Sequence, residues 1–490
     1  MYTTSEAKAL EKLNYYKIRE MIRATWTVGY NMKKPTRWDV LLQFWSILLI
    51  AASLASFYGH FSLFIRYIHD IPRISETIST VFQCTMAIMK MVYFLLAPRK
   101  FYVLLRRACR HEMLLDCELF RVVADLPIAG PLRQHIEGIM NRCWISKRRQ
   151  LLYYLVACSC ILINYFVTSL VVNLYRYSTH DQNNFEVAMP IPSLYPGWMD
   201  KGMTFPYYYV PLMFETANLY LCGMGTLGFD VLFIVLCQHG VGLMQSLSHM
   251  IECSTSTLVP QEVRVEYMRC CIYQYQRVAA YAVELNNTFK HMIIIQFLLS
   301  LFCWGLILFQ MSVGIVSISV PELLRLLCRP ILCPKQATSI TTTLRMFMYL
   351  AAGGYQIVIY CYNGQLFATA VGFHFMPLSL FRYVYVFISR FVFYLQSERI
   401  PKAFYDCLWY AESREFRQLI RMMIMRSNQT FSLDVSWFTK MSLPTLLSVS
   451  VDLFCHFAFR VPLLTVSPSV FQMVRTSGQY FLLLQNITQK

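Results

Sequence analysis

The chain has 490 residues, of which 56% are hydrophobic and only 14% are charged. A soluble globular protein usually carries about 25% charged residues, so this composition argues against a soluble enzyme or binding domain and indicates a membrane protein. The formal net charge of +17 would suit a nucleic-acid-binding protein, but the basic residues form no stripe interleaved with aromatic ones. Contact with anionic lipid accounts for the charge, and we expect no nucleic-acid partner.

Apolar runs predict six membrane-spanning helices, because a bilayer core requires roughly 20 apolar residues per helix. The runs cover about 39–64, 77–97, 151–175, 207–236, 292–316 and 340–369. A seventh helix is expected near the C-terminus, where 441–445 and 471–485 together would suffice. Lys90 lies close to the inner end of the second run, so we expect its ammonium group to snorkel to the membrane surface.

Basic residues accumulate in alternate segments between these runs. Segments 1–37, 98–150, 237–291 and 397–440 hold 8, 11, 4 and 7 Lys and Arg, whereas segments 66–76, 176–206 and 319–343 hold 2, 2 and 3. Because basic residues resist translocation, the richer segments are expected on the cytoplasmic side. The sequence therefore predicts an all-α, seven-transmembrane helical bundle with a cytoplasmic N-terminus and an extracellular C-terminus.

Gly223, Gly225 and Gly228 have the spacing of a dinucleotide-binding fingerprint. That fingerprint requires a preceding strand and a following amphipathic helix, whereas these glycines lie inside the predicted fourth span. Small residues there permit close packing of helices. The sequence has no P-loop, zinc-protease or nucleophile-elbow motif, so we expect no enzyme, no cofactor and no metal.

Polar residues within the predicted spans, such as Glu215 and Asn218, are costly in a membrane. Two interpretations stay open: hydrogen bonds between helices, or a ligand cavity in the outer half of the bundle. Such a cavity would be mainly apolar, with a few polar groups that orient the ligand. The candidate ligand-binding residues are Phe82, Met86, Asn164, Thr168, Tyr208, Phe214, Trp304 and Phe309.

Motifs in the last 130 residues resemble the insect odorant receptor family. Residues 360–365 (YCYNGQ) resemble the inner end of its sixth helix. The segment that follows that helix in the family resembles Ser397-Glu398-Arg399 together with 403–410 (AFYDCLWY). Residues 422–429 (MMIMRSNQ) resemble a helix end of the family, and residues 471–484 (FQMVRTSGQYFLLL) resemble its final helix. Each motif is loose alone, but their order together with an inside N-terminus is fairly specific.

The resemblance implies an odorant-binding subunit of a heteromeric, ligand-gated, non-selective cation channel in the multi-pass membrane of olfactory neuron dendrites. Its implied partners are a small volatile odorant, the lipid bilayer and the family's shared coreceptor, in a hetero-oligomeric tetramer. The loop of about 50 residues between helices 4 and 5 favours the odorant-tuning subunit over the coreceptor. The resemblance further implies that Val474, Ser477 and Tyr480 face the pore or its gate, and that amphipathic segments 241–291 and 403–427 anchor subunits together.

The chain departs from the family pattern at residues 371–396 and 446–470, which interrupt otherwise continuous motifs. Removing these 26 and 25 residues leaves 439 of the 490, a more ordinary length for the family. We interpret both as translated introns, with genuine lineage-specific insertions as the alternative. The remaining segments are a cytoplasmic N-terminal segment (1–38), helices 1–6 with the ligand cavity (39–370), a cytoplasmic anchor helix with the start of helix 7 (397–445) and the pore-lining end of helix 7 (471–490).

Three other functions are alternatives to that of an odorant receptor. A gustatory receptor of the same superfamily would usually end its last helix with Thr-Tyr and Gln-Phe motifs, which are missing here. A seven-pass G-protein-coupled chemoreceptor would need an extracellular N-terminus, which the charge pattern opposes. A secondary transporter would be expected to show paired broken helices or an internal repeat.

Overall fold

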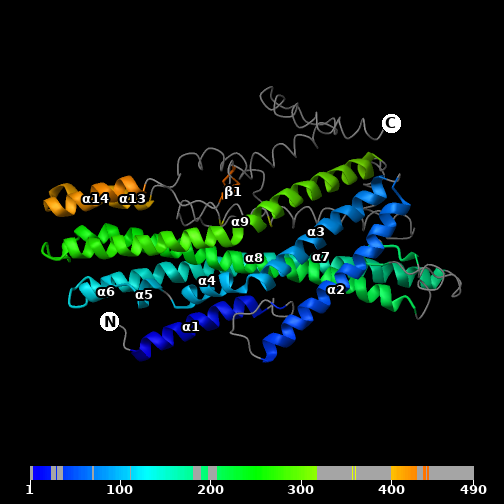
Figure 1. Cartoon of the computed structure of the whole chain (residues 1–490), viewed down its shortest axis with the longest axis horizontal. Coiled ribbons are helices and arrows are strands. Elements are labelled where there is room, and N and C mark those ends of the chain that lie inside the picture. The colour runs from blue at the N-terminus through cyan, green and yellow to red at the C-terminus, as the bar shows by residue number, and fades with distance from the viewer. Residues whose placement is uncertain are drawn as a thin grey trace, which may run out of the picture.

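The computed structural model describes most of the first two thirds of the chain and part of the remainder. The described residues are 4–23, 29, 37–68, 71–110, 112–179, 189–191, 193–196, 207–316, 356, 359, 363, 399–427, 434–436 and 439–440. Within them the chain is almost wholly helical and forms an elongated bundle (Figure 1). Three long helices follow the length of this bundle: α7 (Ala129–Thr179), α8 (Tyr209–Glu252) and α9 (Arg264–Val316).

Four helices among the described residues are long and apolar enough to cross a membrane. The qualifying stretches are Val40–Arg66, Thr77–Leu96, Ala129–Leu174 and Tyr209–Thr255. They lie in α2 (Arg37–Arg66), α3 (Ile71–Leu96), α7 and α8 and confirm the first four predicted spans. The fifth predicted span forms the second half of α9.

The three long helices are much longer than a bilayer is thick. Each continues past its predicted span on the predicted cytoplasmic side, where the predicted helix ends were wrong. They contain 51, 44 and 53 residues, which corresponds to about 77, 66 and 80 Å, against a bilayer core of about 30 Å. The segment 241–291 is not one amphipathic helix. The chain reverses after η4 (Cys253–Thr255), so the end of α8 and the beginning of α9 form an antiparallel hairpin.

Short helices surround this hairpin, on the left in Figure 1. The predicted helix 403–427 is two helices, because the chain turns at η7 between them. A minimal antiparallel strand pair follows. These elements are α1 (Thr4–Ile22), α4 (Pro98–Arg110), α5 (Glu112–Leu115), α6 (Leu119–Val122), α13 (Arg399–Asp406), η7 (Trp409–Ala411), α14 (Arg414–Ser427), β1 (Asp434–Ser436) and β2 (Thr439–Lys440).

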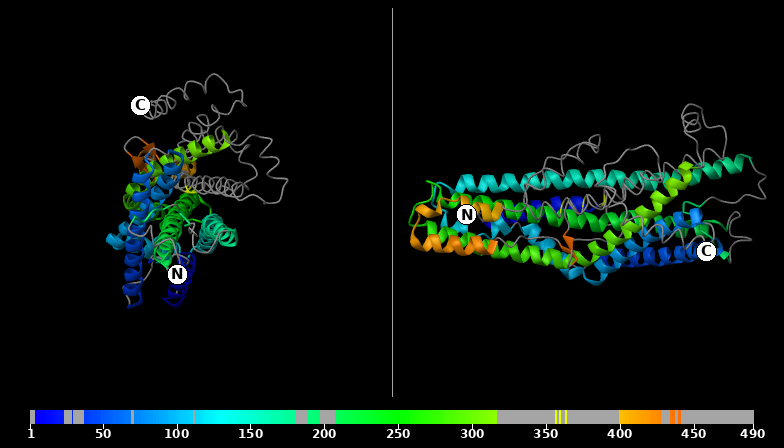
Figure 2. Two further views of the ribbon diagram at one scale, coloured as in Figure 1. Left: turned by 90° about the vertical axis from the view of Figure 1, so that its right-hand side faces the viewer. Right: turned by 90° about the horizontal axis from the view of Figure 1, so that it is seen from above.

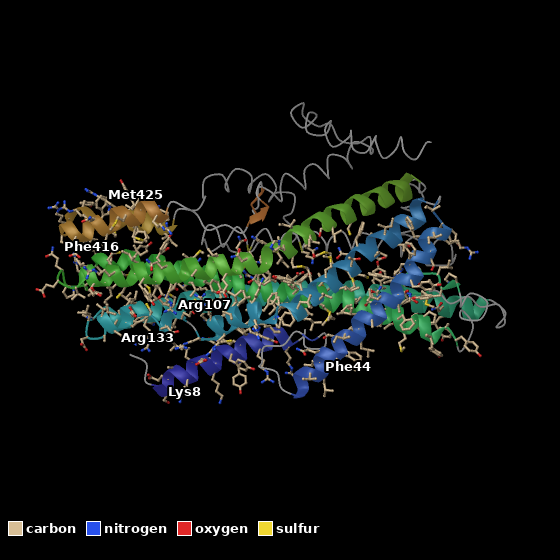
Figure 3. The ribbon with its side chains drawn as sticks, viewed as in Figure 1. Lys8, Phe44, Arg107, Arg133, Phe416 and Met425 are labelled. Carbon is tan, nitrogen blue, oxygen red and sulfur yellow. The ribbon has the colours of Figure 1, made fainter. Side chains whose placement is uncertain are left out.

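Helix α8 is the core of the bundle. In its most apolar window 78% of the residues are buried, against 11% for the corresponding window of α7. The exposed side of α7 carries Ile163, Val167 and Leu170, and α2 exposes Phe44 in the same way (Figure 3). Large apolar side chains on these outer faces suit contact with lipid tails. The end-on view in Figure 2 shows the other helices gathered around α8.

The glycines of the apparent dinucleotide motif serve helix packing, as predicted. A Cβ atom on Gly223 would lie 2.8 Å from Leu162 Cδ1 on α7, and one on Gly225 would lie 3.2 Å from Met91 Sδ on α3. Both distances are tighter than ordinary van der Waals contact, so a side chain at either position would require Leu162 or Met91 to move, and glycine permits the close approach.

Replacing Gly223 by leucine should therefore force α7 and α8 apart. Overpacking of this kind typically costs about 1–3 kcal/mol, and we expect a lower melting temperature for the detergent-purified protein. The control is Gly138→Leu, near the other end of α7, where a Cβ atom would meet only Arg142 Nη1 at 3.8 Å among the described residues. Equal melting temperatures for the two variants would show that the close approach at Gly223 is unimportant.

Candidate functional site

A small cavity lies among α3, α7 and α8, in the half of the bundle predicted to face outward. Its volume is about 80 Å³, and its walls are mainly apolar, with three cysteines among them. The described lining residues are Thr80, Gln83, Cys84, Tyr154, Cys158, Ile161, Leu162, Tyr165, Ile191, Leu219, Cys222, Gly223, Thr226 and Gln356.

Helical periodicity explains why these residues meet. The α7 residues Tyr154, Cys158, Ile161 and Tyr165 recur at steps of four, three and four, so they share one face of the helix. On α8, the lining residues Leu219, Cys222, Gly223 and Thr226 also share one face of the helix. The last three are small and leave the space that the cavity occupies.

Of the eight predicted ligand-binding residues, the six whose side chains the structure describes are not among the residues that line this cavity, and all eight stay predictions. Met86 and Thr168 are buried at other positions on α3 and α7. Tyr208 stacks on Tyr209 with 4.4 Å between ring centroids. The remaining described side chains, Phe82, Asn164 and Phe214, are partly exposed. The side chains of Trp304 and Phe309 lie outside the described residues, as do the predicted pore residues Val474, Ser477 and Tyr480 and both inserts, 371–396 and 446–470.

The inner end of the cavity adjoins the carboxylate of Asp230 on α8, which is completely buried. Lys90 Nζ on α3 donates to Asp230 Oδ1 at 2.7 Å. Tyr154 Oη on α7 and Gln356 Nε2 donate to Asp230 Oδ2 at 2.6 and 2.7 Å. Gln296 on α9 extends the network, because its Nε2 donates to Gln356 Oε1 at 3.2 Å. One carboxylate thus joins α3, α7 and α8 to Gln356 and, through it, to α9.

The expectation that Lys90 snorkels to the membrane surface was wrong. Its side chain has no exposed surface, and it forms an ion pair inside the bundle with Asp230. The pair satisfies two charges that would each be very costly alone in an apolar interior. The sequence signal was the aspartate: an acidic residue within a predicted span needs a compensating partner from another span.

A short segment of the predicted outer loop covers the other end of the cavity. Leu194 N donates to Gly59 O on α2 at 2.9 Å, and Tyr195 Oη donates to Glu215 Oε1 on α8 at 2.7 Å. The ring of Tyr195 lies directly against Gly59, where an added Cβ atom would approach to 2.6 Å. Ile191 from the same segment lines the cavity. We call residues 189–191 and 193–196 the outer strap.

Glu215 and Asn218 form hydrogen bonds between segments, the first of the two interpretations of these residues. Asn218 Nδ2 donates to Ser56 Oγ on α2 at 3.1 Å, and His60 Nε2 lies 3.4 Å from Glu215 Oε2. All four side chains are buried. Neither Glu215 nor Asn218 is a lining residue of the cavity, so this cluster holds α2 and the outer strap against α8.

A second cluster of charges joins helices at the predicted cytoplasmic end, where Arg107 lies among the helices (Figure 3). Arg107 Nε on α4 donates to Glu112 Oε1 at 2.7 Å, and its Nη1 donates to Glu284 Oε2 on α9 at 3.1 Å. Its guanidinium group also lies 5.3 Å from the ring centre of Tyr281. Burial opposes the charge, but the hydrogen bonds and charges of the two glutamates raise the pKa of Arg107 above its ordinary value.

Comparisons with known proteins agree with this architecture. A sequence model of the family described as 7tm Odorant receptor matches residues 70–320 and 392–450. Odorant receptor 63a of Drosophila melanogaster is 50% identical over 490 residues, covering 100% of both chains. Odorant receptor 67b of the same species is 22% identical over 491 residues, covering 99% of this chain and 98% of its own.

The fold is similar to that of the insect olfactory receptor OR5 from Machilis hrabei. The TM-score is 0.64 at 13% identity, covering 93% of this chain and 100% of that one. The same receptor in complex with eugenol gives a TM-score of 0.61 at 13% identity, covering 92% and 99%. At this identity the similarity concerns the fold alone, and it confirms the predicted all-α, seven-transmembrane class.

The chain belongs to the odorant receptor family, because the family model matches more than half of it and a relative is half identical along its whole length. It is therefore a membrane protein of a receptor family and not an enzyme. The predicted identity as an odorant-tuning receptor, not the shared coreceptor, is also confirmed.

Tyr195→Phe should loosen the outer strap, because it leaves the buried Glu215 carboxylate without its hydrogen-bond donor. Hydrogen bonds to charged groups contribute about 1.5–3 kcal/mol, so the melting temperature of the purified protein should fall. Tyr207→Phe is the control, since Tyr207 is 56% exposed. The same melting temperature for Tyr195→Phe and the wild type would contradict a strap held at Glu215.

Arg107→Ala should destabilise the predicted cytoplasmic end, because it leaves the buried Glu112 with the more distant Arg277, 3.8 Å away, as its remaining ion-pair partner among the described residues. Limited proteolysis of the purified receptor should then cleave between α4 and α7 faster than in the wild type. Arg110→Ala is the matched control: Arg110 pairs with Asp116 at 2.8 Å, but its side chain is 52% exposed, and exposed pairs contribute little. Equal cleavage rates for the two variants would contradict the special role of Arg107.

Proposed function

We propose that this chain is an odorant-binding subunit of a heteromeric, ligand-gated, non-selective cation channel. It would act with the shared coreceptor in the dendritic membrane of olfactory neurons. The observation that carries the proposal is the partly open, mainly apolar cavity with a polar inner end, found in a member of the odorant receptor family.

The cavity suits a small volatile ligand. Burial of apolar surface contributes about 25 cal/mol per Å², so apolar walls can hold a molecule that offers few hydrogen bonds. The volume of 80 Å³ is below the roughly 300–1,000 Å³ typical of sites for larger ligands, so binding of all but the smallest odorants requires side chains or the outer strap to move. The structural relative that has been solved with eugenol supports a small organic ligand for this fold.

Opening would follow from preferential binding. A ligand that binds the open arrangement more tightly than the closed one shifts the population toward open. A shift from 1:99 to 99:1 requires a preference of about 5.5 kcal/mol. The outer strap and the Asp230 network contact the cavity from its two ends, so a bound ligand would contact both and could shift either one.

Assembly with other subunits is supported by the exposed apolar side chains of α13, η7 and α14. Tyr405, Tyr410 and Met425 are 67%, 65% and 70% exposed, and Figure 3 shows Met425 on α14, at the end of the bundle far from α2. The charge pattern predicts this end in the cytoplasm, where lipid cannot cover such a patch. Exposed apolar patches in water mark protein contacts, which agrees with the predicted anchor between subunits at 241–291 and 403–427.

The pore assignment and the two inserts belong to the same proposal. Val474, Ser477 and Tyr480 remain the proposed pore or gate positions. Residues 371–396 and 446–470 remain proposed translated introns. The family model leaves out 321–391 and everything after 450, which is more than the two inserts. Odorant receptor 63a aligns along the whole chain, so genuine insertions are kept as the alternative. Transcript reads that join the codons of Ala370 and Ser397 directly would establish the intron account, and reads that retain the intervening codons would contradict it.

The decisive experiment is expression in oocytes with and without the coreceptor, with currents recorded across an odorant panel. We expect cation currents only when both subunits are present. Currents from this chain alone would contradict the obligate heteromer, and silence of both combinations toward every ligand would contradict the proposed function.

The predicted orientation can be tested separately. An epitope tag placed before Met1 should be inaccessible to antibody in intact cells and accessible after permeabilisation, because the N-terminal segment carries 8 basic residues that resist translocation. A tag in the loop 176–206 is the matched control and should stain intact cells. Staining of the N-terminal tag in intact cells would favour a G-protein-coupled receptor instead.

Filling the cavity should block ligand binding without disturbing the polar network. Thr226→Phe on α8 replaces a small lining residue by a large one, and burial of the new ring in the empty space should preserve folding. We expect the odorant-evoked current to be lost at unchanged surface expression. Thr216→Phe is the control, on a half-buried position of α8 that does not line the cavity. Full responses from Thr226→Phe would show that the ligand binds elsewhere.

A further inference from the structure

The ion pair between Lys90 and Asp230 lies directly behind the inner wall of the cavity. Two cavity-lining groups, the Tyr154 hydroxyl and the Gln356 amide, donate to the same oxygen, Asp230 Oδ2, at 2.6 and 2.7 Å. Lys90 Nζ donates to the other oxygen at 2.7 Å. The carboxylate therefore determines where the hydroxyl and the amide lie at the edge of the cavity.

We propose that Asp230, balanced by Lys90, is a positioning residue for odorant recognition. It holds Tyr154 and Gln356 as the polar end of the cavity, and so selects ligands that bear a hydroxyl or carbonyl group over hydrocarbons of the same shape. This inference rests on the proposed function of the cavity and deepens it by naming the ligand class.

The chemistry of the two groups explains the selection. The single proton of the Tyr154 hydroxyl goes to Asp230, so its oxygen can only accept a hydrogen bond, as from an alcohol or a phenol. The amide nitrogen of Gln356 has a second N–H, which can donate to a hydroxyl or carbonyl oxygen. Because the Tyr154 hydroxyl donates to a carboxylate, its oxygen is a stronger acceptor. A hydrocarbon of the same shape offers no hydrogen bond at this end and would cover the polar groups without compensation.

Lys90 has the complementary role. An aspartate without a cation at this depth would be a buried, uncompensated charge, and the ammonium group of Lys90 removes that penalty from the opposite side of the carboxylate. Lys90 is not a lining residue of the cavity. It can therefore balance the charge of Asp230 without itself offering a charged group to the ligand.

The same network connects the cavity to helix α9. Gln356 Oε1 accepts from Gln296 Nε2 on α9, and Gln296 Nε2 also donates to Ser300 Oγ at 2.7 Å. A ligand hydroxyl that donates to Gln356 Oε1 competes with this contact. Since α9 continues to the cytoplasmic hairpin, a shift in this contact acts on the helix that reaches the other end of the molecule.

The test uses the full-length chain with the coreceptor and a panel of isosteric pairs, such as p-cresol with p-xylene and cyclohexanol with methylcyclohexane. In Tyr154→Phe we expect the half-maximal concentration for the oxygen-bearing member to rise about tenfold, the value of one good hydrogen bond, with little change for the hydrocarbon. Tyr165→Phe is the matched control, because Tyr165 lines the same cavity from the same helix, about three turns away from the Tyr154 hydroxyl that donates to Asp230. It should leave the ratio within each pair unchanged.

A second variant tests the positioning role of the carboxylate. In K90M/D230L both charges are replaced together, which leaves no unpaired buried charge, and surface biotinylation reports whether the protein reaches the membrane. We expect the same loss of preference for oxygen-bearing ligands as in Tyr154→Phe. If this variant is retained inside the cell, Tyr154→Phe alone decides the question.

The outcomes separate the two claims. Equal shifts for both members of each pair, or equal effects of Tyr154→Phe and Tyr165→Phe, would overturn the positioning role while leaving the proposed function intact. A wild-type receptor that is silent toward the whole panel and toward all other odorants would overturn the proposed function, and this inference with it.

Discussion

The burial of one carboxylate, Asp230, constrains how the described helices pack. A charge in an apolar interior is tolerated only when it is paired and fully hydrogen-bonded, and Asp230 obtains its partners from α3, α7 and Gln356. A buried ion pair adds little stability over apolar residues of similar volume. Its effect here is on specificity, because only one rotation of α3 and α7 around α8 brings Lys90 and Tyr154 to the two oxygens.

Polar side chains of α8 are arranged in three layers along its length. Glu215 and Asn218 form the outer layer with α2 and the outer strap. Asp230 forms the middle layer. Gln238 forms the inner layer, where its Nε2 donates to Asn363 Oδ1 at 2.8 Å. The cavity lies between the outer and middle layers, so its two ends are bounded by hydrogen bonds while its walls are apolar.

The half of the bundle predicted to be cytoplasmic is held together by ion pairs that are only partly buried. Arg107 connects α4, α5 and α9 through two glutamates, and Arg264 at the start of α9 pairs with Glu412 beside α14. These pairs fix the position of α14, whose outer face still carries exposed apolar side chains such as Met425. A rigid support beneath an uncovered apolar surface is suited to contact between subunits.

Local sequence patterns were sufficient for much of this description. The hydrophobic runs located the first four spans, and the position of Gly223 and Gly225 inside a span identified a packing motif rather than a nucleotide site. The C-terminal motifs and the charge bias pointed to the odorant receptor family. The helix ends were less predictable, since α7, α8 and α9 continue into water, where amphipathic packing replaces hydropathy as the signal.

What the sequence by itself determined is the class of protein, its spans and its expected orientation, because hydropathy and charge act through the solvent and need no knowledge of neighbours. Only the tertiary structure decided which residues line the cavity, that Lys90 pairs with Asp230, and that Glu215 holds the outer strap. The physical reason is that all three depend on how helices far apart in the chain rotate against one another. A helix carries several usable faces, and only the bundle shows which face meets a partner.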